Sequence, residues 1–180
     1  MSAFINENGS PIRMSVLKEL IKDSNNYVEN VDNLPFISEI TSNIRPLIIN
    51  IIKGIRELEP ENNISLILGW CFYAGLGATM LWNINWSQLN KKGVYNALTE
   101  ERGIFEMDEY VLDLIGLPFE SKEAQKLTEH LQESSMKAIV LMAKFSIDKS
   151  QDVVSNVFLE TCEAMYWYGM VIQMNRIGYK

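Results

Sequence analysis

Histidine and cysteine are scarce in this sequence of 180 residues, which contains one histidine and two cysteines. No glutamate lies three residues before His130, so the paired Glu-x-x-His pattern of di-iron helical bundles cannot form. Cys71 and Cys162 lie in apolar stretches, where burial raises the pKa of a thiol and makes it a poor nucleophile. The sequence therefore predicts no metal site, no cofactor and no residue that we assign to catalysis.

Positively charged residues are few. The sequence has 16 lysines and arginines and 23 aspartates and glutamates, which gives a net charge of −7. A polyanion such as DNA or RNA would be repelled before any specific contact formed. Docking on an anionic membrane surface requires clustered lysine and arginine on an amphipathic face, and the sequence has no such cluster. We therefore exclude nucleic acid and the membrane surface as partners.

The beginning of the sequence also lacks the features of an export signal. Residues 1–14 contain neither the basic region nor the apolar region of a secretory signal peptide. Together with two cysteines that are typical of reduced thiols, this predicts a cytoplasmic protein. The abundance of isoleucine, asparagine, lysine and glutamate indicates an AT-rich, bacterial genome.

Helical periodicity dominates what the sequence does contain. Apolar residues recur at intervals of three and four along most of the chain. The expected helices and the turns between them lie at 10–22, 36–58, 64–82, 83–93, 94–101, 104–115, 121–145 and 150–175. These features predict an all-α fold, a helical bundle of four long helices plus several short ones with a central buried apolar helix. Residues 1–180 are expected to form a single helical domain, because no linker or repeat divides them.

Capping and helix-breaking residues predict where these helices begin and end. Pro46 removes a backbone donor, so we expect a break near 43–45. The stretch 23–33 is crowded with asparagine and aspartate, which favour a loop. The expected N-caps are Ser10, Asn62 or Asn63, Ser121 and Ser150. The expected C-terminal stops are Gly103 and Gly116.

Residues 64–82 contain no charged side chain at all. Their length permits a membrane span, which needs roughly 20 apolar residues. Trp70 and Tyr73 near the middle, and three glutamates on one flank, disfavour that alternative. We therefore expect this helix to run through the centre of the bundle, covered on every side by other helices.

Residues 164–174 are apolar nearly all round and are the expected neighbour of this apolar helix. Glycine costs about 1 kcal/mol of helix stability relative to alanine, which is tolerable where another backbone approaches closely. The glycines concerned are Gly69, Gly75, Gly77 and, on the second helix, Gly169. We predict a close crossing there, surrounded by Trp70, Tyr73, Tyr166 and Trp167. The bundle seam of the last helix is expected at Val154, Val157, Thr161, Met165, Tyr168, Ile172 and Asn175.

Three functions fit these features, and the first is a non-enzymatic interaction or regulatory module that self-associates as a dimer. Its acidic surface suits a basic protein partner, and acids are densest between Glu100 and Asp113. Methionine and aromatic side chains are enriched in interface cores, which makes the last helix the candidate interface. The predicted interface residues are Trp167, Met170, Val171 and Met174.

The second function is the binding of a small apolar ligand, because helical bundles hold such ligands between facing helices. The predicted ligand-binding residues are Trp70, Tyr73, Thr79, Trp82, Trp86 and Tyr166. The third function is an enzyme that uses carboxylates as acid and base. Glu163 and Glu133 are its candidates, since both lie on expected core helices near apolar neighbours.

Overall fold

The computed structural model describes residues 11–24, 38–42, 44–58, 61 and 63–178, and that part of the chain is helical with no strand. The helices are α1 (Pro11–Lys22), α2 (Ser38–Thr41), α3 (Arg45–Leu58), α4 (Ile64–Lys92), α5 (Val94–Thr99), α6 (Met107–Leu114), α7 (Lys122–Ser146) and α8 (Gln151–Arg176). The all-α prediction is confirmed. The predicted cap Ser10, most of the predicted loop at 23–33, and Asn62 lie outside the described residues.

The break at Pro46 is where the sequence predicts it. α2 ends at Thr41 and α3 begins at Arg45, so one continuous apolar pattern is divided into two helices. Pro46 falls in the first turn of α3, where a backbone N–H has no partner within the helix and its absence costs little.

Side-chain caps set the beginnings of two of the long helices. Asn63 Oδ1 accepts a hydrogen bond from Leu66 N at 3.0 Å, and Ser121 Oγ accepts one from Ala124 N at 3.1 Å. Both caps confirm the predicted starts of α4 and α7. Ser150 occupies the N-cap position of α8, but its side chain makes no capping hydrogen bond. Gly103 and Gly116 adopt positive φ angles of 81° and 76°, which confirms both predicted stops.

α4 is longer than predicted, because it continues past Trp82 to Lys92 instead of ending in a turn. Asn85 leaves the helical conformation, with φ −155° and ψ 77°. Its Oδ1 accepts hydrogen bonds from Ser87 Oγ at 2.9 Å and from Gln88 N at 3.3 Å. Asn85 thus caps the helical turns that follow it, so α4 consists of two helical pieces joined at a kink.

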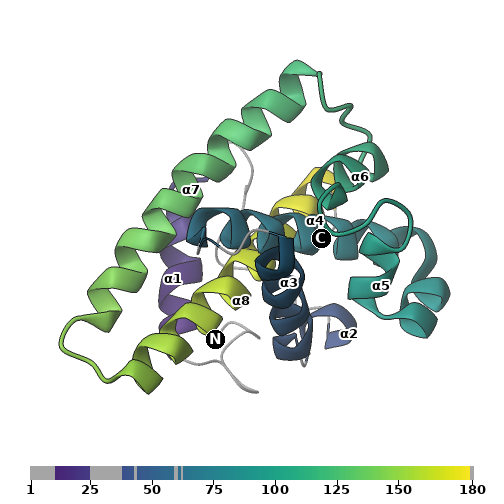
Figure 1. Ribbon diagram of the computed structural model, residues 1–180. Coiled ribbons are helices and arrows are strands. Elements are labelled where there is room, and N and C mark those ends of the chain that lie inside the picture. Colours follow the sequence, from purple (N-terminus) through teal and green to yellow (C-terminus); the bar gives the residue numbers. More distant parts are fainter. Residues whose placement is uncertain (1–10, 25–37, 43, 59–60, 62, 179–180) are drawn as a thin grey trace.

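α4 and α8 cross each other in Figure 1. Their close contact is at Gly75 and Gly169. A Cβ atom on Gly75 would lie 2.0 Å from Tyr166 O, and one on Gly169 would lie 2.1 Å from Phe72 O. No side chain fits between backbones this close, so the predicted crossing is confirmed at this pair.

Two of the four glycines do not belong to that crossing, contrary to the prediction. A Cβ on Gly77 would meet side chains of α5 and α6, Leu98 at 2.6 Å and Val111 at 2.8 Å. A Cβ on Gly69 would meet Leu131 of α7 at 3.7 Å, an ordinary contact distance. Residues at different positions along a helix face different directions, so each of these glycines lies against a different neighbouring helix.

The buried part of α8 extends all round the helix instead of following one seam. Every residue from Glu160 to Met174 is buried, and so is every residue of α4 from Cys71 to Thr79. By length and composition α4 is the one helix in the described part that could cross a membrane, and 67% of its apolar window is buried inside the fold. This burial is what a core helix requires, and it confirms the central apolar helix.

α7 lies along one outer side of the molecule in Figure 1, with α1 next to it. One face of α7 packs on α4 and α8, and its C-terminal end turns sharply into the start of α8. α5 and α6 lie at the end of the molecule away from this turn.

Candidate functional site at the α7–α8 hairpin

Trp70 and Tyr73, two of the predicted ligand residues, use their polar atoms to hold α4 to its neighbours. Trp70 Nε1 donates to Ile104 O at 2.6 Å. The Tyr73 hydroxyl lies 3.4 Å from Thr128 Oγ1 of α7, and burial raises the pKa of Tyr73. These contacts give both residues a role in packing.

Thr79 and Tyr166, predicted to lie near the same ligand, are also used by the fold. Thr79 Oγ1 donates to Gly75 O of its own helix at 2.9 Å. Tyr166 is completely buried, its hydroxyl donates to Ile40 O at 2.8 Å, and burial raises its pKa. Trp82 and Trp86 are half-buried against the core on either side of Asn85.

The four predicted interface residues lie in the core of their own chain. Trp167 is 3% exposed, and the other three, Met170, Val171 and Met174, are not exposed at all. The apolar surface that made α8 a candidate interface is covered by other helices of the same chain, mainly α4, α1 and α7. A second chain therefore has no access to these side chains, and an interface must be sought elsewhere.

Glu163 is buried and held between two guanidinium groups. Its Oε2 lies 2.6 Å from Arg13 Nη1 of α1, and its Oε1 lies 2.7 Å from Arg45 Nε at the start of α3. Arg45 Nη1 also donates to Asn156 Oδ1 at 3.3 Å. Glu133, the other predicted carboxylate, lies on the exposed face of α7. Glu163 thus joins three helices, and the two carboxylates occupy different environments.

His130 lies between α7 and α8 beside a buried tyrosine. Its Nε2 is 2.5 Å from the Tyr168 hydroxyl. Burial lowers the pKa of His130, and the nearby Glu133 raises it by less. At neutral pH the imidazole is therefore uncharged and suits its place at the core boundary.

The two cysteines are buried and face each other from α4 and α8. Burial raises the pKa of Cys162 well above its ordinary value, and the neighbouring Cys71 thiol raises it further. For Cys162 this agrees with the expectation that burial keeps a thiol protonated and makes it a poor nucleophile.

The acidic region around α6 is partly neutralised by its own cations. Arg102 Nη2 lies 2.6 Å from Asp113 Oδ2, and Lys92 Nζ lies 2.5 Å from Glu100 Oε2. Within the described residues, no group of three or more histidine, cysteine, aspartate or glutamate side chains is placed to hold a metal ion. This region therefore offers less negative charge to a basic partner than its sequence indicates.

An apolar stripe follows the outer face of the C-terminal half of α7. Met136 is 59% exposed, Val140 64% and Ile147 64%, and Ala143 between them is also exposed. Met136, Val140 and Ala143 lie on one side of α7, and Ile147, the C-cap residue directly after the helix, continues their spacing of four, three and four residues. The opposite side, with Leu131, is packed into the core. We call this outer set the α7 stripe.

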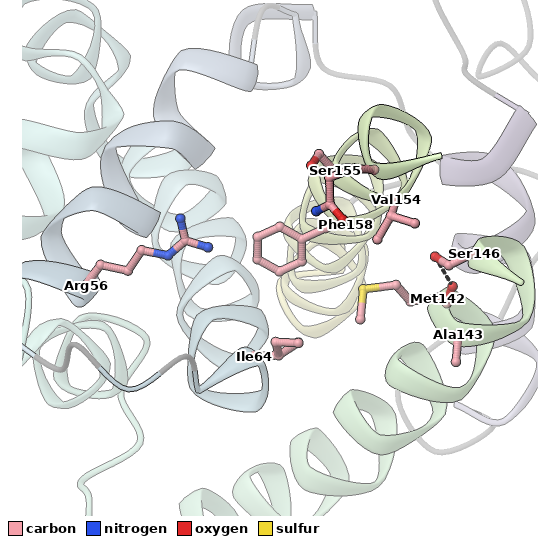
Figure 2. A pocket seen from close by; sticks show the side chains of 9 residues that line it. Arg56, Ile64, Met142, Ala143, Ser146, Val154, Ser155 and Phe158 are labelled. Carbon is pink, nitrogen blue, oxygen red and sulfur yellow. Dashed lines mark hydrogen bonds between the residues drawn. The ribbon is translucent and has the colours of Figure 1, made fainter. Parts of the chain in front are cut away.

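A pocket of about 310 Å³ lies beside the α7 stripe, between the ends of α3, α4, α7 and α8 (Figure 2). Its walls are formed by Arg56, Ile64, Met142, Ala143, Ser146, Gln151, Val154, Ser155 and Phe158. Figure 2 shows the Arg56 side chain extending from α3 toward the ring of Phe158. None of the six predicted ligand residues lines it. Ala143 belongs to both features, so the α7–α8 hairpin carries the candidate site.

Comparisons of this chain with protein-family models, with curated proteins and with solved structures found no match. The α7–α8 hairpin is therefore interpreted from its own geometry.

The sequence contains a signal for the α7 stripe, although the predicted interface lay on α8. The helical spacing of α7 predicts a core face that includes Leu127, Leu131 and Phe145. Met136 and Val140 do not fit that face, and residues left over at helical spacing indicate a second apolar side. The pocket has no comparable signal, because its walls combine two pairs of helices, α3 with α4 and α7 with α8, that are distant from each other in sequence.

Proposed function

We propose that this protein is a non-enzymatic, cytoplasmic interaction module that self-associates through the α7 stripe. The observation that supports this proposal is the group of four exposed apolar residues, three on one face of α7 and Ile147 at its C-cap. Contiguous exposed apolar residues on a soluble protein typically mark an interaction site. Their spacing of four, three and four is the one used by pairs of helices that pack side by side.

A second copy of α7 is the partner that we propose. The chain as a whole has a net charge of −7, but α7 contains four lysines and three glutamates and is close to neutral. Two copies of α7 can therefore approach each other with little repulsion. The stripe also complements itself, because a two-fold axis between Val140 and Ala143 places Met136 opposite Ile147 of the second copy.

The charges that flank the stripe favour an antiparallel pair. Glu129 and Glu133 precede it, Lys144 lies beside Ala143 near its C-terminal end, and Asp148 and Lys149 follow it. An antiparallel arrangement places the acidic end of each stripe against the basic end of the other. A parallel arrangement would instead place like charges together, at a cost in affinity.

Native mass spectrometry and light scattering test the proposal. The wild-type chain is expected to show twice the mass of one chain, and Val140→Glu to raise the dimer dissociation constant by at least about tenfold, because it buries an unpaired charge. Ile84→Glu is the matched control, since Ile84 is 58% exposed on α4 and lies outside the stripe. A wild-type chain that stays monomeric at its highest soluble concentration would overturn the proposal, and so would equal effects of the two variants.

The antiparallel arrangement has its own test by exchange of charges. Lys149→Glu is expected to weaken the dimer, because the two-fold axis places position 149 beside Glu133 of the second copy, which then faces a glutamate. Mixing this variant with Glu133→Lys restores opposite charges across the interface and should give a heterodimer. Surface pairs contribute only about 0.2–1 kcal/mol each, so the effect is a shift in dissociation constant of a few-fold. An unchanged dissociation constant in Lys149→Glu would contradict the antiparallel arrangement.

A further inference from the structure

Met136 differs from the other methionines of the described part of the chain in its exposure. It is 59% exposed and belongs to the α7 stripe. The others are completely buried (Met107, Met165, Met170 and Met174) or half-buried (Met14, Met80 and Met142). We propose that Met136 is a modification site, whose oxidation to the sulfoxide by a hydroperoxide dissociates the dimer. This regulation rests on the self-association through the α7 stripe proposed above.

The thioether of Met136 is the group in the stripe that a hydroperoxide can oxidise, since the side chains of Val140, Ala143 and Ile147 are hydrocarbon. The sulfur lone pair attacks one peroxide oxygen, the O–O bond breaks, and the sulfur is oxidised by two electrons as the S–O bond forms. The second oxygen leaves with the hydrogen of the first. It leaves as water from hydrogen peroxide and as an alcohol from an organic hydroperoxide.

The two cysteines do not compete with Met136 for the oxidant. Cys71 and Cys162 are completely buried, so a hydroperoxide does not reach them in the folded chain. Burial also raises the pKa of Cys162, which keeps its thiol in the less reactive protonated form. The exposed thioether is therefore the preferred target.

Oxidation places a polar group where the second copy packs. The two-fold axis between Val140 and Ala143 puts Met136 opposite Ile147 of the second copy, so the sulfoxide oxygen lies against a side chain that cannot donate a hydrogen bond. Burying a polar group without a hydrogen bond is unfavourable. Because the dimer is symmetric, this cost applies at both ends of the interface.

Self-association in turn protects the thioether. Met136 is open to solvent on a single chain and is covered when the second copy packs on the stripe. Oxidation therefore occurs on the dissociated chain, and the sulfoxide prevents that chain from associating again. The oxidation rate of Met136 is expected to fall as the protein concentration rises above the dimer dissociation constant. An exposed methionine outside an interface would show no such dependence.

Treatment with hydrogen peroxide, followed by peptide and native mass spectrometry, tests the proposal. The peptide that contains Met136 should gain one oxygen atom before the peptides that contain the other methionines. The oxidised chain should show a dimer dissociation constant at least about tenfold above that of the untreated chain. The two methionine sulfoxide reductases, one for each epimer, should restore the original value.

Three variants separate the effect of Met136 from oxidation elsewhere. Met136→Leu conserves the volume and has no sulfur at this position, so it should dimerise with and without peroxide. Met136→Gln imitates the polarity of the sulfoxide and should weaken the dimer without peroxide. Ile84→Gln is its matched control, because Ile84 is 58% exposed on α4 and lies outside the stripe. Circular dichroism checks that each variant keeps the helical content of the wild type.

Three results would overturn this regulation. The first is oxidation of Met136 no faster than that of the buried methionines, and the second is an unchanged dimer after Met136 has been oxidised. The third is loss of the Met136→Leu dimer in peroxide. A chain that is already monomeric before peroxide is added would overturn the self-association itself and the regulation with it, so the two failures are distinguishable.

Discussion

Glu163 connects α8 with α1 and α3 through a single carboxylate. Both of its oxygens contact guanidinium groups, from Arg13 at 2.6 Å and from Arg45 at 2.7 Å. The guanidinium carbon of Arg13 also lies 4.3 Å from the centre of the Trp167 ring. A buried ion pair contributes little net stability, because desolvation offsets the attraction. Its effect is to specify how the three helices meet.

The substitution Glu163→Gln tests this connection. It removes the negative charge and leaves the buried Arg13 guanidinium without its counter-ion, so we expect a loss of about 3 kcal/mol in the free energy of unfolding. Urea denaturation at neutral pH measures it. Glu133→Gln on the exposed face of α7 is the control and should change stability by less than about 0.5 kcal/mol. Equal effects of the two substitutions would show that Glu163 is not held as described.

At the scale of whole helices, the crossing of α4 and α8 depends on the absence of two side chains. Gly75 faces Tyr166 O and Gly169 faces Phe72 O, so each glycine admits the backbone of the other helix. The cost of glycine in a helix is about 1 kcal/mol per residue relative to alanine. Close packing of two buried helices offsets this cost.

Gly75→Ala and Gly69→Ala should have opposite effects on stability. At Gly75 the new Cβ meets backbone that cannot move without separating the helices, so we expect a loss of about 3 kcal/mol or a failure to fold. At Gly69 the nearest atom is 3.7 Å away, and alanine should stabilise α4 by up to about 1 kcal/mol. Thermal and urea denaturation of both variants measure the difference. A well-folded Gly75→Ala protein of unchanged stability would contradict the close crossing.

At the scale of the whole molecule, one hydrophobic core joins the helices of the described part. The buried cluster includes Val16 and Leu17 of α1, Ile51 of α3, Leu98 of α5 and Val111 of α6, together with the buried faces of α4, α7 and α8. Each of these helices contributes to the same core. That residues 1–180 form a single domain stays a prediction.

A single core predicts a single unfolding transition. Far-ultraviolet circular dichroism reports all the helices, whereas tryptophan fluorescence reports mainly α4 and α8, which carry the four tryptophans. The urea denaturation curves from the two probes are expected to coincide. Two transitions with separate midpoints would instead indicate two folding units.

How far the sequence predicts the structure depends on how local the signal is. The caps at Asn63 and Ser121 were predictable, because each involves a backbone N–H three residues away. The continuation of α4 past Asn85 was not, since a local cap and a turn have the same residue pattern. The contact of Arg13 with Glu163 could not be predicted, because the two residues are 150 positions apart and no local spacing indicates that they meet.

At the candidate site, too, the local signal was predictable and the long-range arrangement was not. The sequence indicated an interaction surface but placed it on α8, because methionine and aromatic residues at helical spacing look alike in an interface and in a core. Exposure depends on which other helices cover a face. In the structure α8 is covered from Glu160 to Met174, and the outer side of the C-terminal half of α7 is not covered.

By itself, the sequence determined the all-α class, the helix boundaries at caps, glycines and Pro46, and the glycine crossing between two apolar helices. These features follow from periodicity, local hydrogen bonds and side-chain size, which act over a few residues. Only the tertiary structure decided which apolar faces stay exposed, which glycine meets which helix, and that Arg56 shares a pocket with Phe158. Those outcomes depend on how distant helices pack, because burial is a property of neighbours in space and not of neighbours in sequence.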